Sequence, residues 1–138
     1  MCQRNSLLLI ENNVISKNNF EKFGEDPLLM TTAEEAEYIM KNTNNKVGLL
    51  LDVAHLKVSA NTLGFDPIDY FILCNEWIEG YHLSDNDGYA DSNHSVKENS
   101  WFWSYLKDDL NYHTLEVYST NMDTLKKQMK LTLSKLRT

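Results

Sequence analysis

Short apolar runs alternate along this chain with longer segments of helical periodicity. The clearest run, residues 47–53, is continuous and far too short to cross a membrane. A run of this kind is typical of a strand that is buried on both faces, as the strands of parallel sheets are. Three other runs predict further strands, and they cover residues 7–10, 78–83 and 113–118.

Helix signals lie between these runs. Thr32 and Glu35 form a capping-box pattern, which predicts a helix that continues to Met40. Asp66 before Pro67 predicts the start of another helix. The remaining segments predict a polar loop over residues 12–27, a short helical turn over residues 57–60 and a short aromatic helix over residues 100–106.

A closing helix completes the pattern, with leucines and Met129 on one side and lysines on the other. The order is a strand and a helix repeated four times, which predicts an α/β fold with a parallel sheet and right-handed crossovers. No linker or low-complexity segment divides the sequence. We therefore expect residues 1–138 to form a single domain.

The amino-acid composition restricts the classes of function that the protein can have. The 138 residues carry a formal net charge of -7 at pH 7, which argues against a general binder of nucleic acid or anionic membranes. Cys2 and Cys74 form no CxxC pair and do not suggest a disulfide framework. Because the sequence shows neither a signal-peptide pattern nor an apolar span, the expected location is the cytoplasm.

Each predicted strand ends at or near a side chain that can bind a metal ion: Glu11, Asp52, His82 and Glu116. Adjacent parallel strands lie about 4.8 Å apart, so groups at neighbouring strand ends can converge on one cation. Three carboxylates and one imidazole suit a divalent metal ion such as Mn²⁺, Mg²⁺ or Co²⁺, and Zn²⁺ is compatible. A single acid at a strand end is usually a solvated loop residue or a helix cap, so only the ordered set of four favours a metal site.

Four motifs resemble those of the xylose isomerase-like barrel superfamily, which includes sugar phosphate isomerases, epimerases and the endonuclease IV branch. The matching segments are residues 9–13 (LIENN), 51–55 (LDVAH), 81–88 (YHLSDNDG) and 114–116 (TLE). They span nearly the whole chain but only the second half of the family's barrel, strands five to eight. The resemblance implies half of a (β/α)8 TIM barrel.

The resemblance also implies an activity, a metal-dependent isomerase or epimerase acting on a sugar or sugar phosphate. The implied metal ligands are Glu11, Asp52, His82 and Glu116. Glu11 and Glu116 would also transfer a proton beside the substrate carbonyl, through an enediolate. His55 and Asp85 would contact the substrate. For His55, a second metal ion and the plain satisfaction of a loop carbonyl are the alternatives.

Residues 91–99 resemble the family's DxHHxxGEG loop, with departures. Asn93 stands where the endonuclease branch has a metal-binding histidine, and Lys97 and Asn99 replace glycines. The missing histidine argues against a three-zinc nuclease, so an endonuclease IV-like phosphodiesterase ranks as the second alternative. His94 and Glu98 are expected to contact substrate, against the alternative of ordinary loop polarity.

The family's barrel needs about 250 residues, and this chain has about half that length. Four parallel strands alone leave two edges and an inner face open, which favours pairing with another chain. The expected partner is a second copy, giving a homo-oligomer, or a separate N-terminal half-barrel chain. The first alternative function is an incomplete, non-catalytic half-barrel that mainly self-associates.

Aromatic residues 101–103 would cap a sugar site or, as we favour, pack in the core.

Overall fold

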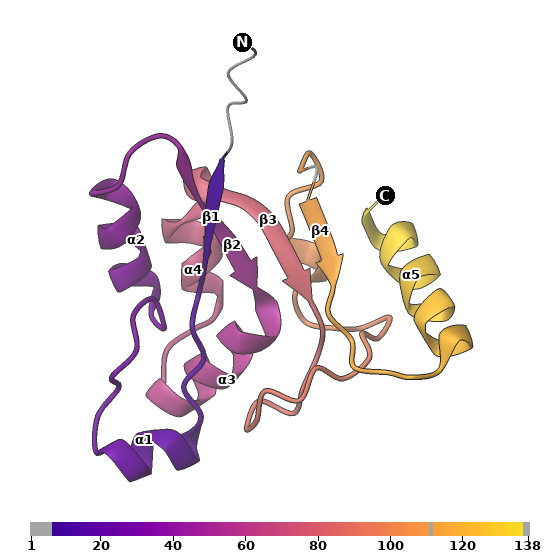
Figure 1. The fold of residues 1–138 in the computed structure, drawn as a ribbon, viewed down its shortest axis with the longest axis horizontal. Coiled ribbons are helices and arrows are strands. Elements are labelled where there is room, and N and C mark those ends of the chain that lie inside the picture. Colours follow the sequence, from indigo (N-terminus) through magenta and orange to yellow (C-terminus); the bar gives the residue numbers. More distant parts are fainter. Residues whose placement is uncertain (1–6, 111, 137–138) are drawn as a thin grey trace.

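The computed structural model describes residues 7–110 and 112–136, and its centre is a four-stranded sheet (Figure 1). The strands are β1 (Leu8–Glu11), β2 (Val47–Asp52), β3 (Ile78–Leu83) and β4 (Tyr112–Leu115). They lie side by side in chain order, and each pair is parallel, as predicted. The four carboxyl ends therefore meet at one end of the sheet, the lower one in Figure 1.

Helices connect the strands and follow the last one. The α-helices are α1 (Lys17–Phe23), α2 (Ala33–Lys41), α3 (Val53–Leu63), α4 (Ile68–Leu73) and α5 (Met122–Leu136). Two short 3₁₀ segments, Asn75–Trp77 and Trp103–Tyr105, come before β3 and β4. The second stands where the sequence predicts a short aromatic helix over residues 100–106, so that prediction is wrong in both type and length. Within the described ranges, no helix is long and apolar enough to cross a membrane.

Two α-helices, α1 and α3, also differ from the sequence prediction. The expected polar loop contains α1, which Ser16 caps by accepting a hydrogen bond from the Asn19 N–H and which ends at Gly24 with φ 75°. Because α1 buries no residue, it has no apolar stripe that the sequence could reveal. The expected short turn is the 11-residue helix α3, in which small buried residues such as Ala54 and Ser59 obscure the periodicity.

Strand β2 passes directly into helix α3 at Asp52. This residue ends the strand and also caps the helix, because its Oδ1 accepts hydrogen bonds from the N–H groups of Ala54 and His55, each at 2.8 Å. No loop separates the two elements. The tight junction places His55 in the first helical turn, close to the strand end.

The hydrophobic core covers one face of the sheet. Leu49 and Leu51 of β2 and Tyr81 and Leu83 of β3 are 0% exposed and pack with residues of α2, α3 and α4. Phe102 is also 0% exposed, which confirms the favoured prediction of core packing for this aromatic residue. The helices therefore hold the sheet from a single side.

The opposite face and the two edge strands have less cover. A Cβ on Gly80 would lie 3.1 Å from Tyr112 Cβ and 3.3 Å from Leu50 Cδ1, so these three residues share that face. Tyr112 on β4 is 63% exposed, and Leu8 on the other edge strand, β1, is 62% exposed. Exposed apolar residues on sheet edges favour pairing with further strands.

Candidate metal centre

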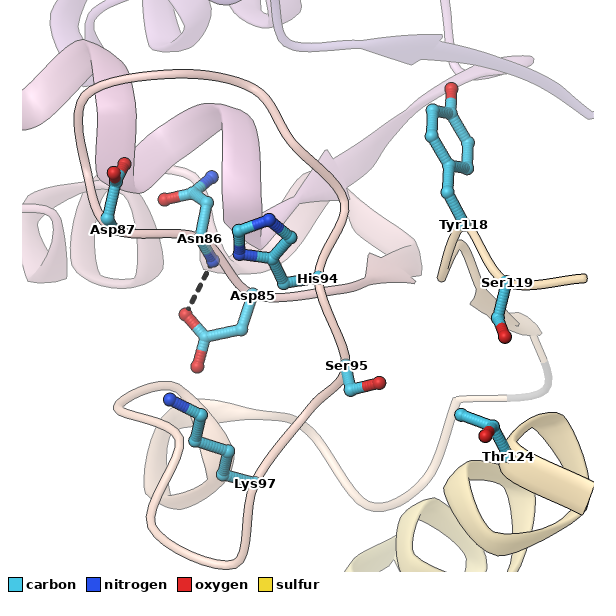
Figure 2. A pocket seen from close by; sticks show the side chains of 9 residues that line it. All are labelled: Asp85, Asn86, Asp87, His94, Ser95, Lys97, Tyr118, Ser119 and Thr124. Carbon is cyan, nitrogen blue, oxygen red and sulfur yellow. Dashed lines mark hydrogen bonds between the residues drawn. The ribbon is translucent and has the colours of Figure 1, made fainter. Parts of the chain in front are cut away.

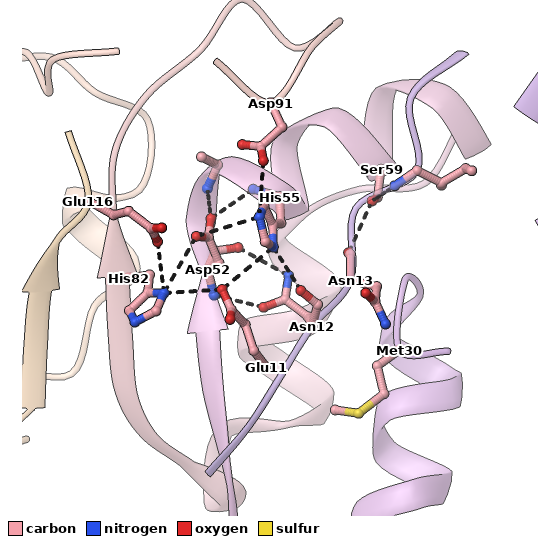
Figure 3. A network of polar contacts seen from close by, with 12 residues as sticks. Glu11, Asn12, Asn13, Met30, Asp52, His55, Ser59, His82, Asp91 and Glu116 are labelled. Atoms are coloured by element: carbon pink, nitrogen blue, oxygen red, sulfur yellow. Dashed lines mark hydrogen bonds and ion pairs between the residues drawn. The ribbon is translucent and has the colours of Figure 1, made fainter. Parts of the chain in front are cut away.

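Four side chains with metal-binding groups meet at the carboxyl end of the sheet (Figure 3). They come from the end of each strand: Glu11, Asp52, His82 and Glu116, the last directly after β4. Each offers one ligand atom, and these atoms all lie within 4.8 Å of one another. The structure thus brings together all four residues that the sequence predicts as metal ligands.

His82 contacts all three acids of this group. Its Nδ1 lies 2.9 Å from Glu116 Oε2, 3.1 Å from Glu11 Oε1 and 3.9 Å from Asp52 Oδ2. Ionised carboxylates only accept hydrogen bonds, so a proton on Nδ1 can donate to the oxygens of Glu116 and Glu11. Metal ligands must be deprotonated, so a cation among the same oxygens would replace that proton.

Asp52 is the most buried of the four. Its side chain is 1% exposed, against 35% for Glu11 and 33% for Glu116. Oδ1 caps α3, whereas Oδ2 is buried and has no hydrogen-bond partner among the described residues. Burial raises the pKa of Asp52 to about 6, with a smaller rise from the Glu11 carboxylate, while His55 and the capping N–H groups oppose it.

These features fit a divalent cation. A buried carboxylate oxygen without a partner is unfavourable, and a cation would satisfy it. The donor set is mainly oxygen with one imidazole, which suits Mn²⁺ or Mg²⁺ and is compatible with Co²⁺ or Zn²⁺. Two ligands of one such ion lie at most about 4.2 Å apart, so the present spacing requires only a small contraction.

His55 lies beside the four residues and contacts a further acid. Its Nδ1 is 2.9 Å from the Asn12 carbonyl oxygen, which can only accept, so Nδ1 carries a proton. Nε2 is 3.3 Å from Asp91 Oδ2 and 3.9 Å from Asp52 Oδ2. Burial lowers the pKa of His55, but Asp52, the Asn12 carbonyl, Asp91 and Glu11 outweigh it and hold this pKa above 6.5. His55 thus satisfies a loop carbonyl and also borders the centre.

Asp85 and His94 belong to a second polar group. Their backbones exchange hydrogen bonds of 2.9 and 2.7 Å. The Asp85 carboxylate accepts from Lys57 Nζ at 2.7 Å, the Asn86 N–H at 2.8 Å and Ser100 Oγ at 2.7 Å. Burial raises the pKa of Asp85, but the hydrogen bonds from Lys57 and Ser100 and the charge of Lys57 outweigh it, so this pKa lies below its usual value.

Asp85 and His94 also line a polar cavity of about 450 Å³ between the loops that follow β3 and β4 (Figure 2). Tyr118 lines it from the second loop, and Thr124 lines it from the first turn of α5. Glu98 is not part of this lining, since its side chain is 77% exposed and pairs with Lys135 of α5 at 2.9 Å. Substrate contact by Asp85, His94 and Glu98 stays a prediction.

Sequence reasoning misses three contributors to these groups. Asn12 holds the backbone of Asp52, Asp91 contacts His55, and Lys57 pairs with Asp85. The available signals were weak: Asn12 directly follows a predicted ligand, and Asp91 is the first residue of the loop that resembles the family's DxHHxxGEG motif. Lys57 gave no signal, because its partner is distant in sequence.

Comparisons with known proteins bear on the fold. No family model and no curated protein matches the chain. The structure is similar to the crystal structure of a Rhodospirillum rubrum protein provisionally named a xylose isomerase, with a TM-score of 0.65 and 20% sequence identity over 96% of this chain and 47% of that chain. The chain thus spans about half the length of that protein. It has the fold of half of a xylose isomerase-like TIM barrel, as its sequence motifs predict.

Proposed function

We propose that the chain provides the metal-bearing half of a divalent-metal-dependent isomerase or epimerase that acts on a sugar or sugar phosphate. The observation that carries this proposal is the convergence of Glu11, Asp52, His82 and Glu116 within 4.8 Å. The likeness to half of a protein provisionally named a xylose isomerase agrees with it. When bound, the cation would polarise the carbonyl and hydroxyl oxygens of the substrate.

The three acids of the centre differ in burial, and this difference indicates different roles. Asp52 is 1% exposed, so it can hold a cation but cannot reach a substrate. Glu11 and Glu116 are 35% and 33% exposed and approach His82 from the two edge strands. Two accessible carboxylates on opposite sides of one site can remove a proton from a carbon and return it. We therefore assign the acid–base chemistry to Glu11 and Glu116.

We propose further that more βα units complete the sheet, from a second copy of the chain or from a separate chain with the other half of the barrel. The exposed edge residues Leu8 and Tyr112 and the open inner face support this. The same edges support the alternative function, a non-catalytic half-barrel that mainly self-associates. Assembly and activity are therefore tested together.

The first experiment measures Mn²⁺ binding by calorimetry and by the melting temperature. We expect Mn²⁺ to raise the melting temperature of the unaltered protein, and Glu11→Gln and Glu116→Gln to weaken binding at least ten-fold. Glu37→Gln is the matched control, because Glu37 pairs with Lys41 on α2 at 2.8 Å and lies outside the centre. Failure of the unaltered protein to bind Mn²⁺ would contradict the proposal.

The second experiment separates an enzyme from a non-catalytic half-barrel. The Mn²⁺-loaded protein is incubated in D₂O with free and phosphorylated aldoses and ketoses, and deuterium at the carbon beside the carbonyl is followed by NMR. We expect exchange that falls about 100-fold or more in Glu11→Gln and Glu116→Gln. Sedimentation velocity on the same samples reports assembly. Mn²⁺ binding and self-association without exchange on any sugar would favour the non-catalytic alternative.

A further inference from the structure

Asn12 is buried beside the metal centre without offering it a ligand. It follows Glu11 at the end of β1 and is 2% exposed. Its amide spans the backbone of Asp52 on the neighbouring strand: Nδ2 donates to the Asp52 carbonyl at 3.1 Å, and Oδ1 accepts from the Asp52 N–H at 2.7 Å (Figure 3). The amide thus continues the pairing of β1 with β2 beyond Glu11 and Leu50.

This double hydrogen bond restricts the direction of the Asp52 carboxylate. Asn12 bonds both the N–H and the carbonyl of Asp52, and Asp52 Oδ1 accepts from two N–H groups of α3. The remaining oxygen, Oδ2, lies 3.9 Å from His82 Nδ1 within the group of four ligands. Asn12 therefore contributes to aiming Asp52 Oδ2, the one buried carboxylate oxygen without a hydrogen-bond partner among the described residues.

The backbone of Asn12 acts on the other side of the centre. Its carbonyl oxygen accepts from His55 Nδ1 at 2.9 Å and so orients the imidazole ring. Nε2 of that ring then faces Asp91 Oδ2 at 3.3 Å and Asp52 Oδ2 at 3.9 Å. One residue thus holds the backbone of Asp52 and the ring of His55 at once.

We propose that Asn12 is the positioning residue of this centre, with its side-chain amide aligning Asp52 and its backbone carbonyl orienting the ring of His55. This role rests on the proposed metal-dependent function. A ligand that is already directed by its surroundings loses less conformational freedom on binding, and the groups that direct metal ligands typically change affinity by 10- to 100-fold. Removal of the Asn12 amide should therefore weaken metal binding by more than its effect on stability explains.

The test compares Asn12→Ala with a variant that removes a similar amide elsewhere. Asn86 is 6% exposed, its Nδ2 donates to the Ala54 carbonyl at 2.9 Å and its Oδ1 accepts from the Gly88 N–H at 2.9 Å. Asn86→Ala therefore removes two hydrogen bonds between a side-chain amide and the backbone, as Asn12→Ala does, but leaves the backbone of Asp52 held. Both variants should lower the melting temperature by similar amounts.

We expect Asn12→Ala to weaken Mn²⁺ binding at least ten-fold, and Asn86→Ala to change it by less than about three-fold. Equal losses in the two variants, or unchanged binding in Asn12→Ala, would overturn the positioning role. If Asn12→Ala does not fold, Asn12→Ser is the milder variant, because its hydroxyl cannot reach both backbone groups of Asp52. The same ten-fold criterion applies to it.

A metal-free measurement keeps this role separate from the proposed function. In the metal-free protein, hydrogen exchange followed by NMR should show a protected Asp52 N–H, because Asn12 Oδ1 accepts its hydrogen bond. In Asn12→Ala we expect this N–H to exchange at least about ten-fold faster than in Asn86→Ala, in which the bond is kept. Failure of the unaltered protein to bind Mn²⁺ would overturn the metal function, whereas equal exchange of the Asp52 N–H in the two variants would overturn the positioning role of Asn12.

Discussion

Asp52 and Asp85 are two buried aspartates at the carboxyl ends of neighbouring strands, but their carboxylates differ in the partners that they have. Asp52 ends β2 and is 1% exposed, while Asp85 lies two residues beyond β3 and is 8% exposed. Lys57 and Ser100 bond both oxygens of Asp85. Asp52 uses one oxygen to cap a helix, and its other oxygen has no hydrogen-bond partner in the described part of the chain.

This difference is visible in the acidity of the two groups. Burial raises the pKa of Asp52 to about 6. At Asp85 burial acts in the same direction, but Lys57 and Ser100 outweigh it and lower the pKa. Buried carboxylates with complete partners hold structure together, and those left incomplete mark candidate functional sites. The contrast therefore separates an acid whose two oxygens are bonded within the protein from an acid with a buried oxygen placed to hold a cation.

The largest expected effect comes from Asp52→Asn. Asparagine can still cap α3 through its Oδ1, but it removes the charge and the free oxygen that a cation would bind. We expect the Mn²⁺ affinity to fall about 100-fold or more. We also expect the metal-free variant to be more stable at pH 7 by about 1 kcal/mol, because a buried charge is removed. Calorimetry and urea unfolding measure the two changes.

The paired outcome makes this prediction specific. A substitution that merely disturbs the fold lowers stability and affinity together, whereas Asp52→Asn should move them in opposite directions. Such opposition is the usual trade-off between a functional site and stability. Retained Mn²⁺ binding in Asp52→Asn would contradict the inference that Asp52, unlike Asp85, binds the cation.

The second expected effect belongs to Asp85→Asn and should appear in stability and not in Mn²⁺ affinity. The change leaves Lys57, whose side chain is 31% exposed, without its ionic partner. We expect the free energy of unfolding at pH 7 to fall by about 2 kcal/mol, less than for a fully buried pair because water partly screens the lysine. Mn²⁺ affinity should stay within about three-fold of the unaltered protein. A loss of Mn²⁺ binding here would show that the two polar groups are coupled.

Sequence patterns predicted the scaffold of this comparison. The apolar runs gave the strands and their order, and the strand ends gave the four side chains that meet at the centre, because neighbouring parallel strands end together. Helix α1 could not be predicted, since it buries nothing. Strand β4 ends at Leu115, three residues before the predicted end.

The partners that distinguish the two aspartates could not be predicted. Lys57 reaches Asp85 across 28 positions, and Asn12 reaches Asp52 across 40. Sequence periodicity indicates which face a residue occupies but not which distant side chain it meets. In the sequence, Asp52 and Asp85 were both acids near strand ends, and only the fold shows that one is satisfied.

The smallest expected effect is the pH dependence of the metal-free protein. The pKa of Asp52 is about 6 in the folded protein, against an ordinary value of 3.8 for a solvated aspartate, so between these values the folded protein binds more protons than the unfolded chain. Acidification from about pH 7 to about pH 5 should therefore raise the free energy of unfolding through this group, by about 1 kcal/mol. His55 acts in the same direction, because its pKa is also raised.

Asp85 affects the free energy of unfolding in the opposite direction and over a different pH range. Its folded pKa is lowered, so its contribution is complete above the ordinary pKa of 3.8 and is lost only as the pH falls below that value. Urea unfolding of the unaltered protein, Asp52→Asn and Asp85→Asn at about pH 7 and pH 5 separates the two. The rise in the free energy of unfolding on acidification should shrink in Asp52→Asn and persist in Asp85→Asn. With saturating Mn²⁺, acidification should instead lower the free energy of unfolding, because protons then compete with the cation for the same oxygens.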